Sequence, residues 1–187
     1  MKYPNGIKLN TTKNITYDNR GMGLEDDINL TNQYYIDNNI AFIYKKPTPI
    51  QVIKVDYSKN SAIIKEAYFK EPSTTDYNGL YKGKYIDFEA KETNSKTSFP
   101  IKNIHKHQIN HIKNIYENGG ISFLIIRFNK LSKTYLLLGK DLINFIEHND
   151  RSSIPILFFE DNAYLIEEKY IPRIDYLKVI DSIFGGI

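Results

Sequence analysis

The residues best suited to chemistry in this sequence are two acids and one amine within a short stretch. Glu89 and Lys91 stand two residues apart, and Asp76 precedes them by a short interval. Side chains alternate along a β-strand, so Glu89 and Lys91 share one face of the strand that carries them. We expect Asp76 to reach the same patch from the preceding strand, which would place two carboxylates beside one ammonium.

That combination suits a magnesium ion and a phosphodiester. Mg²⁺ takes few carboxylate ligands and keeps waters and substrate phosphate oxygens in its shell. A bound metal activates water and polarises the phosphoryl oxygen, and an ammonium complements the charge that develops there. We therefore predict a metal-dependent nuclease with Asp76, Glu89 and Lys91 as catalytic residues. A general-base role for Lys91 stays open, and a surface ion pair on an exposed strand is the alternative interpretation.

The elements that must position these residues are two strands of a predicted hairpin. The segments 76–77 and 81–90 are prone to strand formation, and Asn78-Gly79 between them is a strong hairpin signal. We expect an antiparallel pair that brings Asp76 across a tight turn to the acid and amine of the second strand.

The rest of the chain alternates helical and strand patterns, which predicts the α/β class. A projection is expected where proline interrupts the strand at Lys45–Pro49, with two β-prone segments flanking a turn at 56–60. We predict a flexible arm at 1–19 and one nuclease domain at 20–187, with 45–70 as a stalk insertion. The other elements expected from periodicity are helices at 23–38, 103–118, 142–148 and 176–184 and strands at 40–44, 121–128 and 134–138.

Composition sets limits on function. With 187 residues and 41% hydrophobic content, the chain can bury one ordinary core. The absence of cysteine excludes disulfides, thiolate zinc sites and cysteine nucleophiles. No apolar run approaches the roughly 18 residues that cross a bilayer, and no leader pattern stands out, so we expect no membrane partner and a cytoplasmic location. A net charge of +3 is compatible with a nucleic-acid partner without requiring one.

The residues around the acids and the amine resemble the RecU-type Holliday junction resolvases. The resemblance implies a restriction-endonuclease-like fold, with a mixed β-sheet core flanked by helices and a protruding stalk inserted between strands, and a homodimer. It runs from about Asn19 to Phe128 and continues more loosely to the C-terminus. The segments that carry it are Asn19–Glu25, Lys45–Pro49, Tyr68–Gly79, Gly83–Thr93, His107-Gln108 and Gly119-Gly120.

The resemblance also assigns a ligand set. It implies that Thr74, Asp76, Glu89 and Gln108 contact Mg²⁺, for which Mn²⁺ is expected to substitute, and that Lys91 stabilises the transition state. The assignment of Thr74 as a metal ligand rests on the resemblance alone.

Two further side chains have competing interpretations. Gln108 falls on the apolar stripe of its predicted helix, where an amide needs a partner, so either a ligand or a satisfied buried glutamine explains it. Glu25 is an additional candidate acid near the metal, although an acid in the first turn also stabilises a helix dipole.

Basic residues around the expected stalk and hairpin form a candidate phosphate track. Each cation that neutralises a phosphate adds about 0.9 to the salt slope of binding. A lone lysine is more often a solvated charge, so the prediction concerns the set. Its members are Arg20, Lys45, Lys46, Lys65, Lys70, Lys82 and Lys84.

We therefore expect a Mg²⁺-dependent endonuclease that nicks opposed strands of four-way DNA junctions in recombination, repair and chromosome segregation. Recombinase and branch-migration proteins are further expected partners. The alternatives are a nuclease of linear or damaged duplex and a non-catalytic DNA- or recombinase-binding protein.

Overall fold

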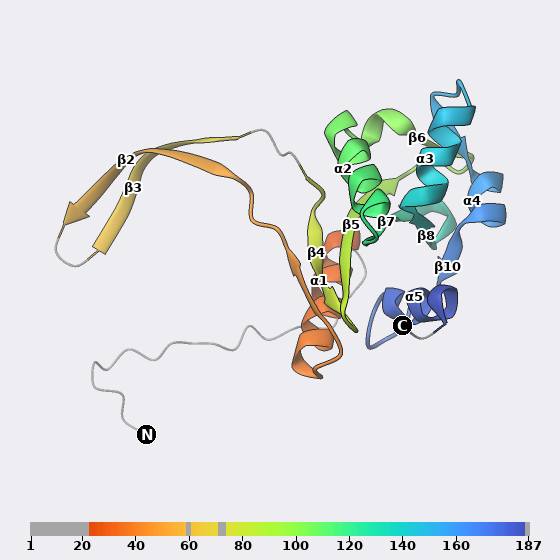
Figure 1. The fold of residues 1–187 in the computed structure, drawn as a ribbon, viewed down its shortest axis with the longest axis horizontal. Coiled ribbons are helices and arrows are strands. Elements are labelled where there is room, and N and C mark those ends of the chain that lie inside the picture. Colours follow the sequence, from red (N-terminus) through yellow and green to blue (C-terminus); the bar gives the residue numbers. More distant parts are fainter. Residues whose placement is uncertain (1–22, 59–60, 71–73, 186–187) are drawn as a thin grey trace.

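The computed structural model describes residues 23–58, 61–70 and 74–185. The predicted arm at 1–19 and the candidate DNA contact Arg20 lie outside these residues. The centre of the fold is a six-stranded mixed sheet in the order β1-β4-β5-β7-β8-β10 (Figure 1). Strands β5 and β7 run parallel and the other neighbouring pairs are antiparallel. The six strands are Phe42–Lys45 (β1), Tyr77–Tyr81 (β4), Lys84–Thr93 (β5), Ile121–Phe128 (β7), Lys133–Leu138 (β8) and Tyr164–Ile166 (β10).

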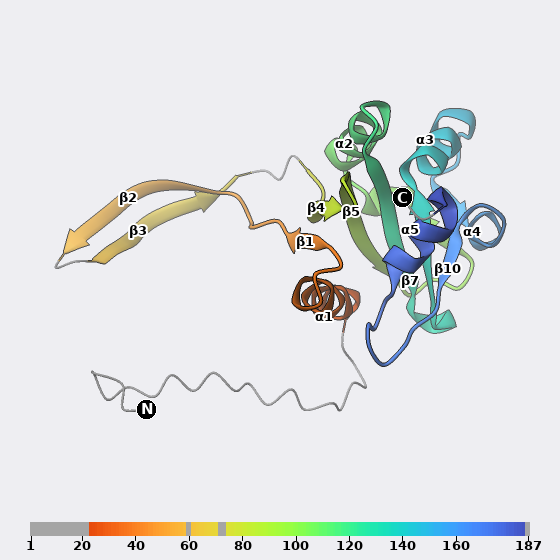
Figure 2. The same cartoon turned by 60° about the horizontal axis from the view of Figure 1, so that its bottom comes forward.

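Helices cover both faces of this sheet. Helices α1 (Leu24–Asp37) and α5 (Tyr176–Phe184) share one hydrophobic core with it. The second core, on the opposite face, contains residues of α2 (Lys106–Glu117), α3 (Gly139–His148) and α4 (Ile156–Asn162), and Figure 2 shows α1 and α2 on opposite sides of the strands. Short elements complete the fold: two 3₁₀ turns at Ile101–Asn103 and Asn129–Leu131, and a strand pair of Ser98–Pro100 (β6) and Ser153–Pro155 (β9). The predicted α/β class and the mixed sheet flanked by helices are confirmed.

Alternation along the central strands decides which side chains can form a site. On β5, Phe88 and Ala90 belong to the core beneath α1 and α5. Their neighbours Asp87, Glu89 and Lys91 must then face the α2 side of the sheet. The parallel partner β7 is buried along its whole length, as its continuous apolar run predicts.

The predicted turn of the hairpin is wrong. Asn78 and Gly79 lie inside β4, and the chain reverses at Lys82-Gly83, where both residues have positive φ, 46° and 78°. Two consecutive positive φ angles are the requirement of a type I′ turn. Gly79 has a different reason to be glycine, because a Cβ there would lie 2.0 Å from the carbonyl oxygen of Phe42 on β1.

This correction changes how the acids meet. Asp76 directly precedes β4, whose first residue Tyr77 pairs with Phe88. It therefore lies opposite Glu89 at the open end of the hairpin, away from the turn. Asp76 and Glu89 approach each other across the antiparallel ladder.

A two-stranded stalk stands apart from the sheet, as expected. Strands β2 (Ile50–Ser58) and β3 (Ser61–Phe69) pair only with each other among the described strands and project away from the core (Figures 1 and 2). Strand β2 extends further than the sequence suggested, since it includes most of the predicted turn at 56–60, whereas β3 has the predicted bounds. The stalk leaves the sheet after β1 and returns before β4.

The remaining elements match their predictions closely. The helix predicted at 103–118 begins later, at Lys106, and ends before Gly119, which takes a positive φ of 82°. Strands β6, β9 and β10 and helix α4 were not predicted. Within the described residues, no helix is both long and apolar enough to cross a membrane.

Candidate active site

The structure brings the three predicted catalytic groups together at the open end of the β4–β5 hairpin. The Lys91 ammonium donates to Glu89 Oε1 at 2.5 Å, and the backbone N–H of Asp76 donates to Glu89 Oε2 at 3.0 Å. The side chain of Glu89 is fully buried, whereas that of Lys91 keeps 22% of its surface exposed. A buried carboxylate thus lies between a second acid and an amine that solvent and substrate can reach.

The electrostatics of Glu89 favour a cation at this place. Burial raises the pKa of its carboxyl, Lys91 opposes the rise and Asp76 adds to it, with a resulting value of about 7. This carboxylate is hard to ionise in the free protein. A bound cation would stabilise its ionised form. A pair of acids suits Mg²⁺, which keeps several waters and substrate oxygens in its shell. The donor set therefore fits the predicted metal.

A second polar cluster lies beside this pair, centred on Asp87. Its carboxylate is fully buried and meets the Lys46 ammonium at 2.8 Å, the Tyr85 hydroxyl at 2.9 Å and the His111 Nε2 at 3.2 Å. The Thr75 hydroxyl donates to its other oxygen. Asp87 faces the same side of β5 as Glu89, but positively charged and hydroxyl groups already surround it.

Two residues of the resemblance-based ligand set have protein partners. The Gln108 amide oxygen accepts the backbone N–H of His105 at 2.9 Å, in a capping box that closes the start of α2. This hydrogen bond accounts for a buried glutamine without a metal. The Thr74 hydroxyl donates to the Thr75 carbonyl at 3.3 Å. The assignment of both residues as metal ligands stays a prediction.

The additional candidate acid, Glu25, forms an ion pair with Lys45 on the surface. This pair gives the carboxylate a partner other than the proposed metal site. The pair also neutralises Lys45, which is one member of the predicted phosphate track.

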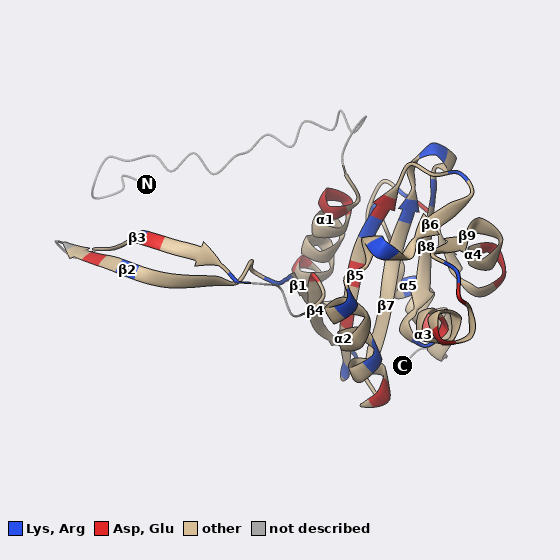
Figure 3. Ribbon diagram, turned by 90° about the horizontal axis from the view of Figure 1, so that it is seen from above, with Lys and Arg blue, Asp and Glu red and all other residues tan. Residues whose placement is uncertain are grey.

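Several other members of that track are paired. Lys46 is largely buried against Asp87, and Lys82 binds Asp181 of α5 at 3.1 Å, at the turn end of the hairpin. On the stalk, Lys65 lies 3.5 Å from Asp56, and the two strands carry two lysines and two acids (Figure 3). Among the predicted contacts that the structure describes, Lys70 and Lys84 have no ion pair with a described residue. The two stalk strands themselves are balanced in charge, and the role of the predicted set in DNA contact stays a prediction.

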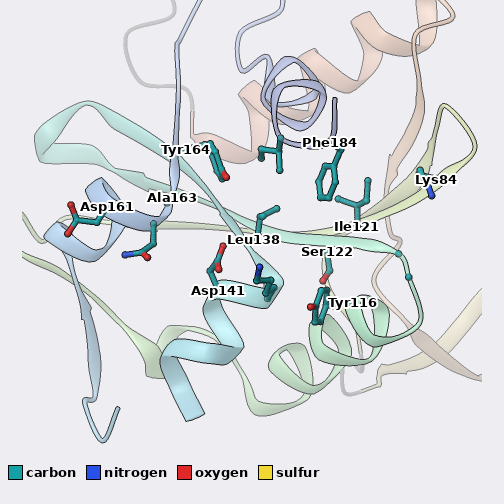
Figure 4. A pocket seen from close by; sticks show the side chains of 15 residues that line it. Lys84, Tyr116, Ile121, Ser122, Leu138, Asp141, Asp161, Ala163, Tyr164 and Phe184 are labelled. Atoms are coloured by element: carbon teal, nitrogen blue, oxygen red, sulfur yellow. The ribbon is translucent and has the colours of Figure 1, made fainter. Parts of the chain in front are cut away.

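A cavity of about 800 Å³ lies elsewhere. Residues of α2, α3, α5 and the starts of β5 and β7 line it, and Figure 4 shows Asp141, Tyr164 and Phe184 around its interior. Its β5 member is Lys84, which is roughly 16 Å along the strand from Glu89 at about 3.3 Å per residue. Burial raises the pKa of Asp141, but no second acid contacts it among the described residues. The cavity is therefore separate from the site of Asp76, Glu89 and Lys91.

Comparison with known proteins identifies the family. The family model described as "Recombination protein U", RecU, matches residues 19–182. The chain is 50% identical over 196 residues to "Holliday junction resolvase RecU" of Bacillus cereus strain G9842, with 98% of each chain covered. The corresponding protein of Bacillus cytotoxicus is 49% identical over the same share of both chains. The chain belongs to the RecU family.

One of the solved structures similar to this RecU family member is much more distant in sequence. It is a Holliday junction resolvase, Hjc, from Archaeoglobus fulgidus, with a TM-score of 0.38 and 5% sequence identity, covering 68% of this chain and 85% of that chain. A similarity at this level supports no conclusion about the fold. The family membership rests on the sequence matches.

Sequence reasoning missed one part of this RecU site, the cluster around Asp87. The signal was present, because Asp87, Glu89 and Lys91 alternate on one strand face. What the sequence could not give was the partners. Lys46 and His111 come from segments 41 residues before and 24 residues after Asp87, and only the fold brings them there.

Proposed function

We propose that this protein is a Holliday junction resolvase, an endonuclease that needs Mg²⁺ and nicks opposed strands of four-way DNA junctions in recombination, repair and chromosome segregation. The observation that carries the proposal is the convergence of Asp76, Glu89 and Lys91 on one patch. Relatives named Holliday junction resolvase RecU at 50% identity over nearly the whole chain supply the substrate class.

Each of the three groups has a role that follows from its surroundings. Glu89 and Asp76 would hold the metal through their carboxylates, with Thr74 and Gln108 as further contacts implied by the family. When bound, Mg²⁺ supplies a Lewis acid for the phosphoryl oxygen and lowers the pKa of a coordinated water. Lys91, anchored by Glu89 and partly exposed, complements the negative charge that grows on the nonbridging oxygens.

The proposed assembly is a homodimer. The stalk exposes a large apolar surface, and a two-stranded hairpin standing alone has little stability in water. A second copy of the stalk would cover this surface, and two catalytic sites related by a two-fold axis would match two opposed strands of a junction. The exposed apolar side chains of the stalk are Ile50, Ile53, Tyr57, Ile63, Ile64, Tyr68 and Phe69.

One assay tests the activity. The purified protein is incubated with a mobile four-way junction and with a linear duplex of the same sequence, each with and without Mg²⁺. We expect paired nicks in the junction and only with the metal. Equal cutting of both DNAs would leave a general nuclease, and cutting in the presence of a chelator would remove the metal from the proposal.

The variant Asp76→Asn separates catalysis from binding. It removes one acid while keeping the backbone N–H that binds Glu89. Junction binding in a gel-shift assay should persist while cutting stops. Cutting at the wild-type rate would mean that Asp76 is outside the active site, and a non-catalytic protein would show no cutting in either form.

The oligomer has its own test. Light scattering should give the mass of a dimer for the wild type and of a monomer after Ile63→Asp, which places a charge on the exposed stalk surface. A monomeric wild type would contradict the proposed assembly. The cytoplasmic location and the recombinase and branch-migration partners stay predictions, which fractionation and co-purification would check.

A further inference from the structure

The buried carboxylate of Asp87 has no part in the proposed chemistry, yet it is among the most densely bonded groups of the protein. Its side chain has no exposed surface. Lys46, Tyr85 and His111 meet one of its oxygens, and the Thr75 hydroxyl donates to the other. Burying a charge is unfavourable unless partners satisfy it, so the geometry of these partners is tightly constrained.

Two of the partners belong to the two connections of the stalk. Lys46 lies between β1 and β2, where the chain leaves the sheet. Thr75 lies between β3 and β4, where the chain returns. The Lys46 ammonium also donates to the Thr75 hydroxyl at 3.0 Å, so both connections are joined to each other as well as to Asp87.

The same cluster holds the segment of Asp76 in place. Thr75 precedes Asp76 directly, and the backbone N–H of Lys46 donates to the Asp76 carbonyl at 2.7 Å. On its other side, the Asp76 N–H binds Glu89. The backbone of this acid is therefore fixed between the stalk connection and the buried glutamate.

We propose that Asp87 is a positioning residue for metal binding: through Lys46 and Thr75 it locks both stalk connections so that the Asp76 carboxylate faces Glu89. The inference rests on the proposed function and assigns this cluster a task within it. Asp87 touches neither the metal nor the substrate in this proposal. A metal ligand on a connection between strands needs such support, because residues that orient ligands change metal affinity by about 10- to 100-fold.

The Thr75 hydroxyl offers the cleanest test, since Thr75→Val keeps the shape of the side chain and removes the bond to Asp87. We expect the Mg²⁺ concentration for half-maximal junction cutting to rise about tenfold, the lower end of the effect of residues that orient ligands. Thr75→Ser keeps the hydroxyl and should restore the wild-type value. Asp87→Asn should act in the same direction as Thr75→Val.

Metal binding is also measured directly, by titrating the protein with Mn²⁺ and following the free ion by electron paramagnetic resonance. The Mn²⁺ dissociation constant should rise in Thr75→Val and Asp87→Asn, whereas junction binding in a chelator stays at the wild-type level. This readout needs no catalysis. If Asp87→Asn does not fold, the two Thr75 variants still decide the matter.

A matched control comes from another buried aspartate. Asp27 is equally buried and pairs with Arg127 at 2.6 Å and with Arg173 at 2.9 Å, on the α1 side of the fold. Asp27→Asn should lower the melting temperature while leaving the Mg²⁺ requirement of the folded protein unchanged. An equal shift in this control would make the effect one of general stability and overturn the inference.

The remaining outcomes are distinct. A Thr75→Val protein with wild-type Mg²⁺ and Mn²⁺ dependence would overturn the positioning role, as would equal impairment of Thr75→Val and Thr75→Ser. A wild type that binds Mn²⁺ but cuts no junction would overturn the proposed function, while the Mn²⁺ shift would still support the positioning role.

Discussion

Replacing Glu89 by glutamine should abolish cutting. In the metal-free protein it should also reduce the loss of stability that the wild type shows as the pH rises. The reason is the buried position of the carboxylate, which raises its pKa from 4.5 to about 7. Between these two values the unfolded chain loses the proton first. Ionisation then favours the unfolded state, so the wild type loses stability from about pH 4.5 up to about pH 7.

The size of the effect follows from the pKa difference. A pKa raised from 4.5 to about 7 corresponds to a loss of about 3 kcal/mol in the free energy of unfolding when the pH is well above both values. About 2 kcal/mol of this is lost between pH 5.5 and pH 8. For a domain of this size, that is a difference of about 4 to 8 °C in melting temperature. The side chain has no exposed surface, so solvent screening takes little from this figure.

The assay is urea denaturation of the wild type and Glu89→Gln at pH 5.5 and pH 8 in the presence of a chelator. The quantity to compare is the change in unfolding free energy between the two pH values, which should be about 2 kcal/mol smaller in the variant. Glu147→Gln is the control. The Lys113 ammonium lowers the pKa of Glu147, so its stabilising contribution is present at both pH values and is lost only in more acidic solution.

Saturating Mg²⁺ adds a second comparison. A bound cation holds the carboxylate in its ionised form, so the wild type should become more stable at pH 8 while Glu89→Gln responds weakly. If the unfolding free energy of the two proteins had the same pH dependence, the reasoning would be refuted. A steeper loss of stability with pH in the variant would refute it as well.

Three further predictions concern stability. Gly79→Ala puts a Cβ 2.0 Å from a backbone oxygen of β1 and should cost about 1 to 3 kcal/mol, visible in thermal denaturation; an unchanged melting temperature would contradict the close approach. Arg127→Met leaves the buried Asp27, which is 1% exposed, with Arg173 as its remaining cation partner among the described residues. It should lower the free energy of unfolding, measured in urea, by about 3 kcal/mol, and a loss below that of a surface ion pair would refute this account. Gln108→Ala removes the cap of α2 and should cost about 1 kcal/mol; a simultaneous rise in the Mg²⁺ requirement would add a ligand role.

The elements of the fold were predictable where the sequence carries a clear period. The apolar run 121–128 is β7, and the helical pattern at 23–38 is α1. These segments bury a whole face or a continuous run, so local pattern and tertiary packing agree. Strand β10 is three residues long and two of its residues are exposed, which leaves no period to recognise.

The hairpin turn shows why a strong local signal can mislead. Asn78-Gly79 has the sequence of a type I′ turn, but Lys82-Gly83 forms it. The deciding contact is tertiary, since β1 approaches Gly79 too closely for any side chain. A glycine that permits a positive φ and a glycine that permits close approach look the same in a sequence.

The juxtaposition of Glu89 and Lys91 was predictable and its surroundings were not. Alternation along one strand places Glu89 beside Lys91 whatever the rest of the fold does. The partners of the lysines depend on segments far apart in the chain, such as Lys82 with Asp181 of α5. This is why a set of lysines that seemed free in the sequence is largely paired in the structure.

The two acids on this face of β5 show how one strand can serve structure and chemistry together. Asp87 and Glu89 are both fully buried, but cation and hydroxyl donors surround Asp87, whereas Glu89 has one lysine and a second acid nearby. The charge of Asp87 is therefore balanced within the protein, whereas Glu89 and the neighbouring Asp76 share the ammonium of Lys91. A buried carboxylate whose charge the fold leaves unbalanced reduces stability unless a ligand completes it. This difference between the two acids is the physical basis for our proposal that a cation binds at Glu89 and that Asp87 holds the chain around it.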